Sequence, residues 1–240
     1  MTIIVGTEGT GCSRAAVTWA AREARRRGDR LRIVHAFDGD RRESQFDIGN
    51  EFTDVTRVLA GAVVAAARSQ ALGVAPGLDV QTAAVPGPVV PTLLAEATGA
   101  QLLVLGHRDR VLPGSVGRRL AAEAPCPVVV VRGRETPDGS VLCEIDDSPA
   151  ADAVLATAFS AADALGCGLV VLGARTLGGR TLDGRLAPWR ERFPGVPAGT
   201  VHTDRTAALV AGSRDARLVV VGSARRRLLR KSGCPVLVAR

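Results

Sequence analysis

Tyrosine is absent from the sequence, and aromatic residues make up only 3% of it. Lysine occurs once, as Lys231, so the net charge of +7 comes almost entirely from arginines scattered along the chain, often beside acidic residues. Proteins that bind single-stranded nucleic acid need aromatic side chains on which bases stack, set among clustered cations. The composition therefore argues against a nucleic-acid partner. The one basic cluster, "RRRLLRK" at 225–231, is interpreted as a solvated helix end, with an anion site as the alternative.

Long apolar runs and metal-binding patterns are also missing. No run approaches the roughly 20 apolar residues of a membrane span, and the N-terminal "MTIIVGTEGTG" lacks the basic and apolar regions of a signal peptide. The five cysteines form no C-x-x-C pair and no metal-ligand spacing with the three histidines. These absences predict a cytoplasmic protein with no membrane partner, no disulfide framework and no metal site.

Motifs of the common catalytic folds do not occur. A Walker A loop needs a lysine after its glycines, and Lys231 lies in "RKSG". The first predicted strand is not followed by G-x-G-x-x-G, and none of the three histidines lies in a recognisable triad motif such as G-x-S-x-G. Asp146 and Asp147 as a metal pair are disfavoured because adjacent residues leaving a strand point in different directions. The sequence thus favours a non-catalytic protein and leaves an enzyme as an open alternative.

What the sequence does contain is an alternation of short apolar runs with helical patterns. Hydrophobic residues make up 46% of the chain, much of it Ala, Val and Leu, which suits strands buried on both faces. Runs bounded by Gly, Pro or charge predict strands at 2–6, 31–37, 79–85, 101–106 and 127–132. Helices are predicted from a cap at Ser13 to Gly28, over 54–72, over 89–98 and from about Ser115. Strict alternation predicts right-handed crossovers and a parallel sheet.

The second half of the chain repeats the first in order. "TIIVGTEGTG" is echoed from Val141 by "VLCEIDDSPA", "AQLLVLGHR" (100–108) by "ARLVVVGSA" (216–224), and "APCPVVVVR" (124–132) by "SGCPVLVAR" (232–240). Three ordered echoes predict a tandem duplication, with domains at 1–133 and 141–240 and a linker at 134–140. The second copy is trimmed. Its interval from Gly222 to Cys234 is 12 positions where Gly106 to Cys126 is 20, and 178–197 replaces a loop and a full helix.

Glycine-containing loops follow the first and fourth predicted strands: "GTEGTG" (6–11) and "GHRDRVLPGS" (106–115). Ligands of open parallel sheets bind where the strand order reverses, at the carboxyl ends of such strands. Glycine lets backbone N–H groups approach an anion, and a helix that follows adds its dipole. Gly114 and Ser115 precede a predicted helix, so Ser115 could cap it and also reach a phosphate oxygen. On spacing alone, a plain capped turn is the preferred interpretation.

Taken together, "VGTEGTGCSRAAVTWAA", "VHAFD", "VLGHRDR", "PGSVGRRLAAEAPCPVVVVR", "EIDDSPAADA", "VVVGSA" and "SGCPVLVAR" resemble a tandem universal stress protein. The resemblance implies two Rossmann-like, adenine nucleotide alpha hydrolase-like α/β domains, the second one trimmed. Each would have a parallel five-stranded sheet of order 3-2-1-4-5, and the two would pair through their fifth strands. It also implies ATP or another adenine nucleotide bound through G-x2-G-x9-G-[ST].

That binding motif is incomplete in the first copy. Gly106 matches its first glycine and Gly114-Ser115 its last pair, but Asp109 stands at the middle glycine, and seven residues rather than the family's twelve separate Gly106 from Gly114. A carboxylate beside a triphosphate opposes binding by roughly 1 to 4 kcal/mol unless a cation such as Mg²⁺ bridges the two. The remaining candidate nucleotide-binding residues that the resemblance implies are Thr7, Glu8, Gly9, Ala36, Val85 and Val116. For Ala36 and Val85, sheet packing is an equal alternative.

The second copy lacks the glycine–serine pair after Gly222, and Asp147 and Glu144 stand at usual glycines, so no nucleotide is expected there. The resemblance therefore implies a non-catalytic stress-response regulator whose first domain senses adenine nucleotide. The alternatives are a nucleotide-free interaction scaffold and, third, a slow ATPase. The partners expected are the internal pair of domains and an unidentified protein, with a homodimer as a further option.

Overall fold

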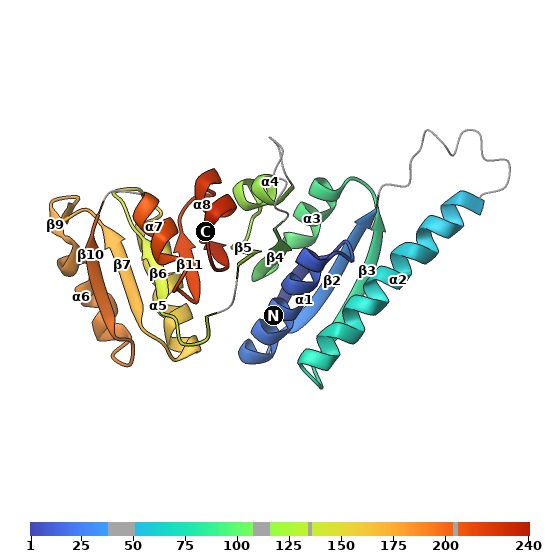
Figure 1. The fold of residues 1–240 in the computed structure, drawn as a ribbon, viewed down its shortest axis with the longest axis horizontal. Coiled ribbons are helices and arrows are strands. Elements are labelled where there is room, and N and C mark those ends of the chain that lie inside the picture. The colour runs from blue at the N-terminus through green and yellow to red at the C-terminus, as the bar shows by residue number, and fades with distance from the viewer. Residues whose placement is uncertain (38–50, 108–115, 134–135, 204–205) are drawn as a thin grey trace. The chain divides into compact units, whose positions relative to one another are not determined.

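The computed structural model describes residues 1–37, 51–107, 116–133, 136–203 and 206–240 (Figure 1). Within them the chain divides into two compact units, Met1–Val131 (unit 1) and Arg132–Arg240 (unit 2). In both units, parallel strands alternate with helices. The predicted fold class, two α/β halves each with a parallel sheet, is therefore confirmed. The linker at 134–140 stays a prediction, and its residues 134 and 135 lie outside the described ones.

Unit 1 contains a five-stranded parallel sheet in the order β5-β4-β1-β2-β3. Its strands are β1 (Thr2–Gly6), β2 (Arg30–Phe37), β3 (Val80–Pro86), β4 (Leu102–Gly106) and β5 (Val128–Val131). Its helices are α1 (Gly11–Arg27), α2 (Glu51–Val74), α3 (Val89–Ala97) and α4 (Val116–Glu123). The central strands β1 and β4 are buried along most of their length, so the core lies on both faces of the sheet.

The helices of unit 1 cover the two faces in pairs. Helix α1 packs against α2, and α3 packs against α4. Right-handed crossovers running from β1 through β2 to β3 place α1 and α2 on one face, and the return through β4 to β5 places α3 and α4 on the other (Figure 1). The side-chain amide of Gln70 in α2 donates to the carbonyl of Arg14 at 2.7 Å and to the Thr18 hydroxyl at 2.8 Å, which fixes α2 on α1.

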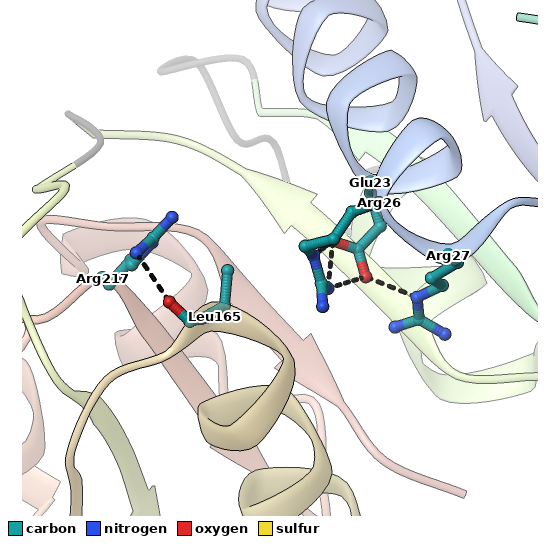
Figure 2. A network of polar contacts seen from close by, with 5 residues as sticks. All are labelled: Glu23, Arg26, Arg27, Leu165 and Arg217. Atoms are coloured by element: carbon teal, nitrogen blue, oxygen red, sulfur yellow. Dashed lines mark hydrogen bonds and ion pairs between the residues drawn. The ribbon is translucent and has the colours of Figure 1, made fainter.

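Helix α1 is tied down at both ends, but its start differs from the prediction. Gly28 ends it in the left-handed conformation (φ 69°), as predicted from the sequence. The predicted cap at Ser13 is wrong. The helix begins at Gly11, and the Ser13 hydroxyl donates to the carbonyl of Thr10 at 3.0 Å within the first turn. Near the other end, the buried Glu23 accepts hydrogen bonds from Arg26 and Arg27 (Figure 2).

Unit 2 repeats this topology in fewer residues, with strand order β10-β7-β6-β11-β12. Its strands are β6 (Val141–Glu144), β7 (Leu169–Gly173), β10 (Ala198–His202), β11 (Leu218–Val221) and β12 (Val236–Val238), beside a hairpin of β8 (Thr176–Leu177) and β9 (Arg180–Thr181). Its helices are α5 (Ala151–Leu165), α6 (Leu182–Arg192), α7 (Thr206–Gly212) and α8 (Arg226–Lys231). Arg217 donates to the carbonyl of Leu165, the last residue of α5 (Figure 2).

Helix α6 corrects the expectation that 178–197 replaces a full helix of the first copy. A helix is retained there, shortened to 11 residues against the 24 of α2. It begins at the cap residue Thr181, whose hydroxyl accepts from the Gly184 N–H at 3.1 Å. The fully buried Phe159 of α5 stacks on Trp189 and on Phe193, with ring centroids 6.1 and 5.7 Å apart. This aromatic cluster holds α6 in place although Pro188 lies inside it.

Candidate functional site

The loop that follows β1 is held by hydrogen bonds from neighbouring residues. The N–H of Thr7 donates to the carbonyl of Val34 in β2 at 2.9 Å, and Thr7 is buried. The Thr7 hydroxyl accepts from the N–H of Gly9 at 3.3 Å, while Gly9 adopts φ 77°, a conformation that favours glycine. Glu8 is exposed and accepts from the Thr10 hydroxyl at 2.9 Å. Three candidate residues, Thr7, Glu8 and Gly9, thus form one ordered turn at the carboxyl end of β1.

His35 supports the same turn and was not among the predicted site residues. Its Nδ1 lies 2.7 Å from the carbonyl oxygen of Thr7, and its ring stacks on Phe37. A carbonyl can only accept, so Nδ1 carries a proton and donates to it. His35 precedes Ala36, and this proximity is the only signal in the sequence that could have pointed to it.

Ala36 and Val85 lie directly opposite each other on β2 and β3. Both are half-buried, and each is one residue from the end of its strand. In the register of β1 with β2, Gly6 pairs with Val34, so Ala36 lies beyond the end of β1, beside the turn at Thr7. The pair is therefore placed at the same edge of the sheet as the turn.

Gly106 ends β4, which is the parallel neighbour of β1. A Cβ atom at Gly106 would lie 2.4 Å from the carbonyl oxygen of Cys12 and 2.9 Å from the Ser13 nitrogen, both in the first turn of α1. Real Cβ atoms do not come so close to backbone atoms, so packing against α1 requires glycine here whether or not a ligand is present. The next residue, His107, donates its N–H to the carbonyl of Val131 at 3.0 Å.

The rest of the predicted phosphate loop lies outside the described residues. This applies to Asp109, Gly114 and Ser115. Val116 is described as the first residue of α4 and is 40% exposed. The structure therefore brings together Thr7, Glu8, Gly9, Ala36, Val85 and Gly106 at the carboxyl edge of one sheet. Among the described residues, no group of three or more His, Cys, Asp or Glu side chains could hold a metal ion.

The corresponding edge of unit 2 is occupied by an ion-pair cluster. Arg225, which precedes α8, contacts Glu144 at the end of β6 (Nη1–Oε2 2.6 Å) and Asp146 just beyond it (Nη2–Oδ2 3.7 Å). Hydrogen bonds from Ser148, together with the charge of Arg225, hold the pKa of Asp146 below its ordinary value. Only residues 222–225 separate β11 from α8, so no glycine-rich loop stands between them.

Unit 1 is thus a doubly wound α/β domain whose strand order reverses between β1 and β4, and whose turns after those two strands meet at the edge where ligands of this class bind. The model of the universal stress protein family matches residues 1–132. A universal stress protein of Mycobacterium tuberculosis is 31% identical over 257 residues, covering 92% of this chain and 86% of its own. One of Mycolicibacterium smegmatis is 31% identical over 260 residues with the same coverage. The chain belongs to the universal stress protein family.

Solved structures agree on the fold. The crystal structure of a universal stress protein from Archaeoglobus fulgidus DSM 4304 covers 100% of this chain and 96% of its own, with a TM-score of 0.82 and 16% identity. At that identity the likeness shows the fold alone. Among the residues that the structure describes, no helix is both long enough and apolar enough to cross a bilayer.

Proposed function

We propose that this chain is a cytoplasmic, non-catalytic regulator of the stress response that binds an adenine nucleotide, ATP foremost, in unit 1 alone. The observation that carries this proposal is the placement of Thr7–Gly9 and Gly106 at the carboxyl ends of β1 and β4, two parallel neighbours from which the chain leaves in opposite directions. This is the point at which open α/β sheets bind ligands. Membership of the universal stress protein family supports it.

The proposed nucleotide lies along this edge. Ala36 and Val85 would contact the base, the turn at Thr7–Gly9 would contact the ribose, and Gly106, Gly114, Ser115 and Val116 would bind the phosphates. The Asp109 carboxylate would oppose the phosphates, and it would hold a Mg²⁺ ion that supplies the missing positive charge when bound. Hard cations are commonly held in this way, by one or two carboxylates plus phosphates.

Unit 2 is proposed to bind no nucleotide, because its own residues satisfy the charges at that edge. The Glu144 side chain is only 11% exposed and already accepts a charged hydrogen bond from Arg225. A nucleotide placed there would add phosphates next to Glu144 and Asp146 and would compete with them for Arg225. Displacing a paired, mostly buried carboxylate is costly, so the internal pair is favoured over the ligand.

The two units are proposed to pair through β5 and β12, each of which ends the sheet of its own unit. All the residues of both strands are Val or Leu. Apolar strands at the end of a sheet need a cover, and a second sheet edge of the same kind provides one. The binding of an unidentified protein partner would then depend on whether unit 1 holds a nucleotide.

Nucleotide binding is tested first on protein purified without added nucleotide. Denaturing that protein and resolving the supernatant by anion-exchange chromatography should release ATP or another adenine nucleotide. Titration calorimetry with ATP, in Mg²⁺ and again in EDTA, should then give heat in the first condition and weaker binding in the second. Measured in EDTA, where no cation offsets the Asp109 carboxylate, Asp109→Gly should tighten binding by about tenfold, because a change of 1.4 kcal/mol, at the low end of the expected repulsion, corresponds to that factor.

Asp147→Gly is the matched control, because it removes an exposed carboxylate from the corresponding edge of unit 2. It should leave the affinity unchanged. If the protein carries no nucleotide and gives no heat with Mg-ATP, the nucleotide-free scaffold replaces the proposal. If the affinity responds to Asp147→Gly and not to Asp109→Gly, the nucleotide binds in unit 2, and the proposed site in unit 1 is wrong. Phosphate released over many turnovers, and lost in Ser115→Ala, would make the protein an ATPase.

A further inference from the structure

Helix α2 presents a continuous uncharged stripe to solvent. Val55, Val58 and Leu59 are 56%, 70% and 62% exposed, and they cluster within two turns of the helix. The same face continues, at helical spacings of three and four residues, through the exposed small residues Ala62, Ala65, Ala66 and Ser69. A helix that packs one face on a sheet normally carries polar or charged side chains on the other. The uncharged stripe therefore indicates a contact surface.

This stripe cannot turn into the core of unit 1. The opposite side of α2 is already packed, with Ala60, Val64, Ala67 and Ala71 all buried. Gln70 locks the rotation of the helix through its bonds to the Arg14 carbonyl and the Thr18 hydroxyl. Within the described part of unit 1, the core therefore leaves the stripe uncovered.

We propose that a second copy of this chain covers it, with the two α2 helices packed antiparallel about a twofold axis near Ala62. The stripe is large at its amino-terminal end, where Val and Leu stand, and small at its carboxyl-terminal end, where Ala and Ser stand. Antiparallel pairing places the large half of each helix against the small half of the other, so the helices keep an even separation. Parallel pairing would set large against large and small against small and splay the helices, and it would align their dipoles unfavourably.

Charge is consistent with this occupant. Each copy carries a net charge of +7, so two copies repel unless they meet on a neutral face. The two exposed cations on this part of the helix, Arg57 and Arg68, lie roughly 120° or more around the helix from the middle of the stripe, at 3.6 residues per turn. Joining the stripes therefore brings none of these like charges into direct contact.

The proposed contact is small, and its area sets the protein concentrations at which the dimer should form. Residues 55–69 span roughly 21 Å at 1.5 Å per residue, and a helix is about 10 Å across, so each copy buries on the order of a few hundred Å². Stable interfaces bury about 800 Å² per partner. We therefore expect a weak, concentration-dependent dimer with a dissociation constant on the order of 100 µM.

Sedimentation of the full chain across concentrations from about 5 to 500 µM should show monomer converting to dimer. The pair of changes Val58→Asp and Leu59→Asp should weaken dimerisation more than tenfold, and because both side chains are exposed the fold should be kept, as circular dichroism would show. The matched control is Val201→Asp, at an exposed valine of β10 in unit 2, which should dimerise like the original chain. A chain that stays monomeric throughout, or one whose dimer is lost in Val201→Asp and not in the α2 variant, overturns the proposal.

The antiparallel register is tested by cross-linking with a short bismaleimide. Ala62→Cys lies near the proposed axis and should give a covalent dimer above the background set by the five native cysteines. Val55→Cys should not, since its two copies would stand roughly 21 Å apart along the axis. Cross-linking of both variants would indicate parallel helices, and cross-linking of neither would exclude the α2 contact; either result contradicts the arrangement.

Discussion

Replacing Gly106 with alanine tests the closest approach in unit 1. The added Cβ would stand 2.4 Å from the Cys12 carbonyl oxygen, 2.6 Å from its carbonyl carbon and 2.9 Å from the Ser13 nitrogen. All three are backbone atoms, so no rotamer change relieves the clash. Either the end of β4 or the first turn of α1 must shift by roughly 1 Å to restore van der Waals separation. Overpacking of this kind costs about 1–3 kcal/mol, and backbone partners place Gly106→Ala toward the upper value.

The assay is urea denaturation followed by far-ultraviolet circular dichroism, in which the transition of unit 1 should move to lower urea while that of unit 2 stays in place. Gly61→Ala is the matched control, because a Cβ at Gly61 has nothing within 4 Å. In the interior of α2 that change should instead raise the free energy of unfolding by about 0.5–1 kcal/mol. If Gly106→Ala unfolds at the same urea concentration as the original chain, the close packing of β4 on α1 is refuted.

Two further predictions concern charged pairs. Arg225→Ala should lower the free energy of unfolding of unit 2 by about 1–3 kcal/mol, since it leaves the mostly buried Glu144 unpaired, and adding Glu144→Gln should recover part of that loss in the same urea assay. A hydrogen bond from Arg32 (Nε–Oε2 2.6 Å) lowers the pKa of Glu96, so this pair stabilises unit 1 above the unfolded-state pKa of about 4.3, and that stabilisation is lost as the pH falls through the lower folded-state value. Glu96→Gln should make the urea midpoint of unit 1 less dependent on pH in the acid range, and an unchanged dependence would contradict the assignment.

The order of strands and helices was predictable from sequence because the hydrophobic periodicity and the residues that bound each element indicated the same secondary structure. Each buried strand is a short run of Val, Leu and Ile bounded by Gly, Pro or charge, and Gly28 stops α1 where only glycine adopts the required conformation cheaply. The start of α1 was not predictable, since Thr10 and Ser13 are both good cap residues and the choice depends on the hydroxyl of Ser13 turning back to the Thr10 carbonyl.

The placement of the described candidate residues at one edge of the sheet was predictable, but the contacts that hold them were not. Sequence reasoning placed Gly106 in a phosphate loop, whereas its packing on α1 requires glycine independently of any phosphate. Long-range contacts such as those of His35 with Thr7, and of Arg225 with Glu144, join residues far apart in the chain. The spacing of residues along one sequence carries no signal for them. Helix α6 was not predicted, and Pro188 inside it is atypical of a helix interior, although Thr181 is a residue type that favours a helix start.

The stacking of Trp189 on Phe159 in unit 2 has a practical consequence, because the chain has only two tryptophans and no tyrosine. The other, Trp19, lies half-buried in α1 of unit 1. Each unit therefore contains its own intrinsic fluorophore. Substituting one indole with phenylalanine leaves an emission spectrum that comes from a single half of the molecule, so the melting of the two halves can be followed separately in the intact protein.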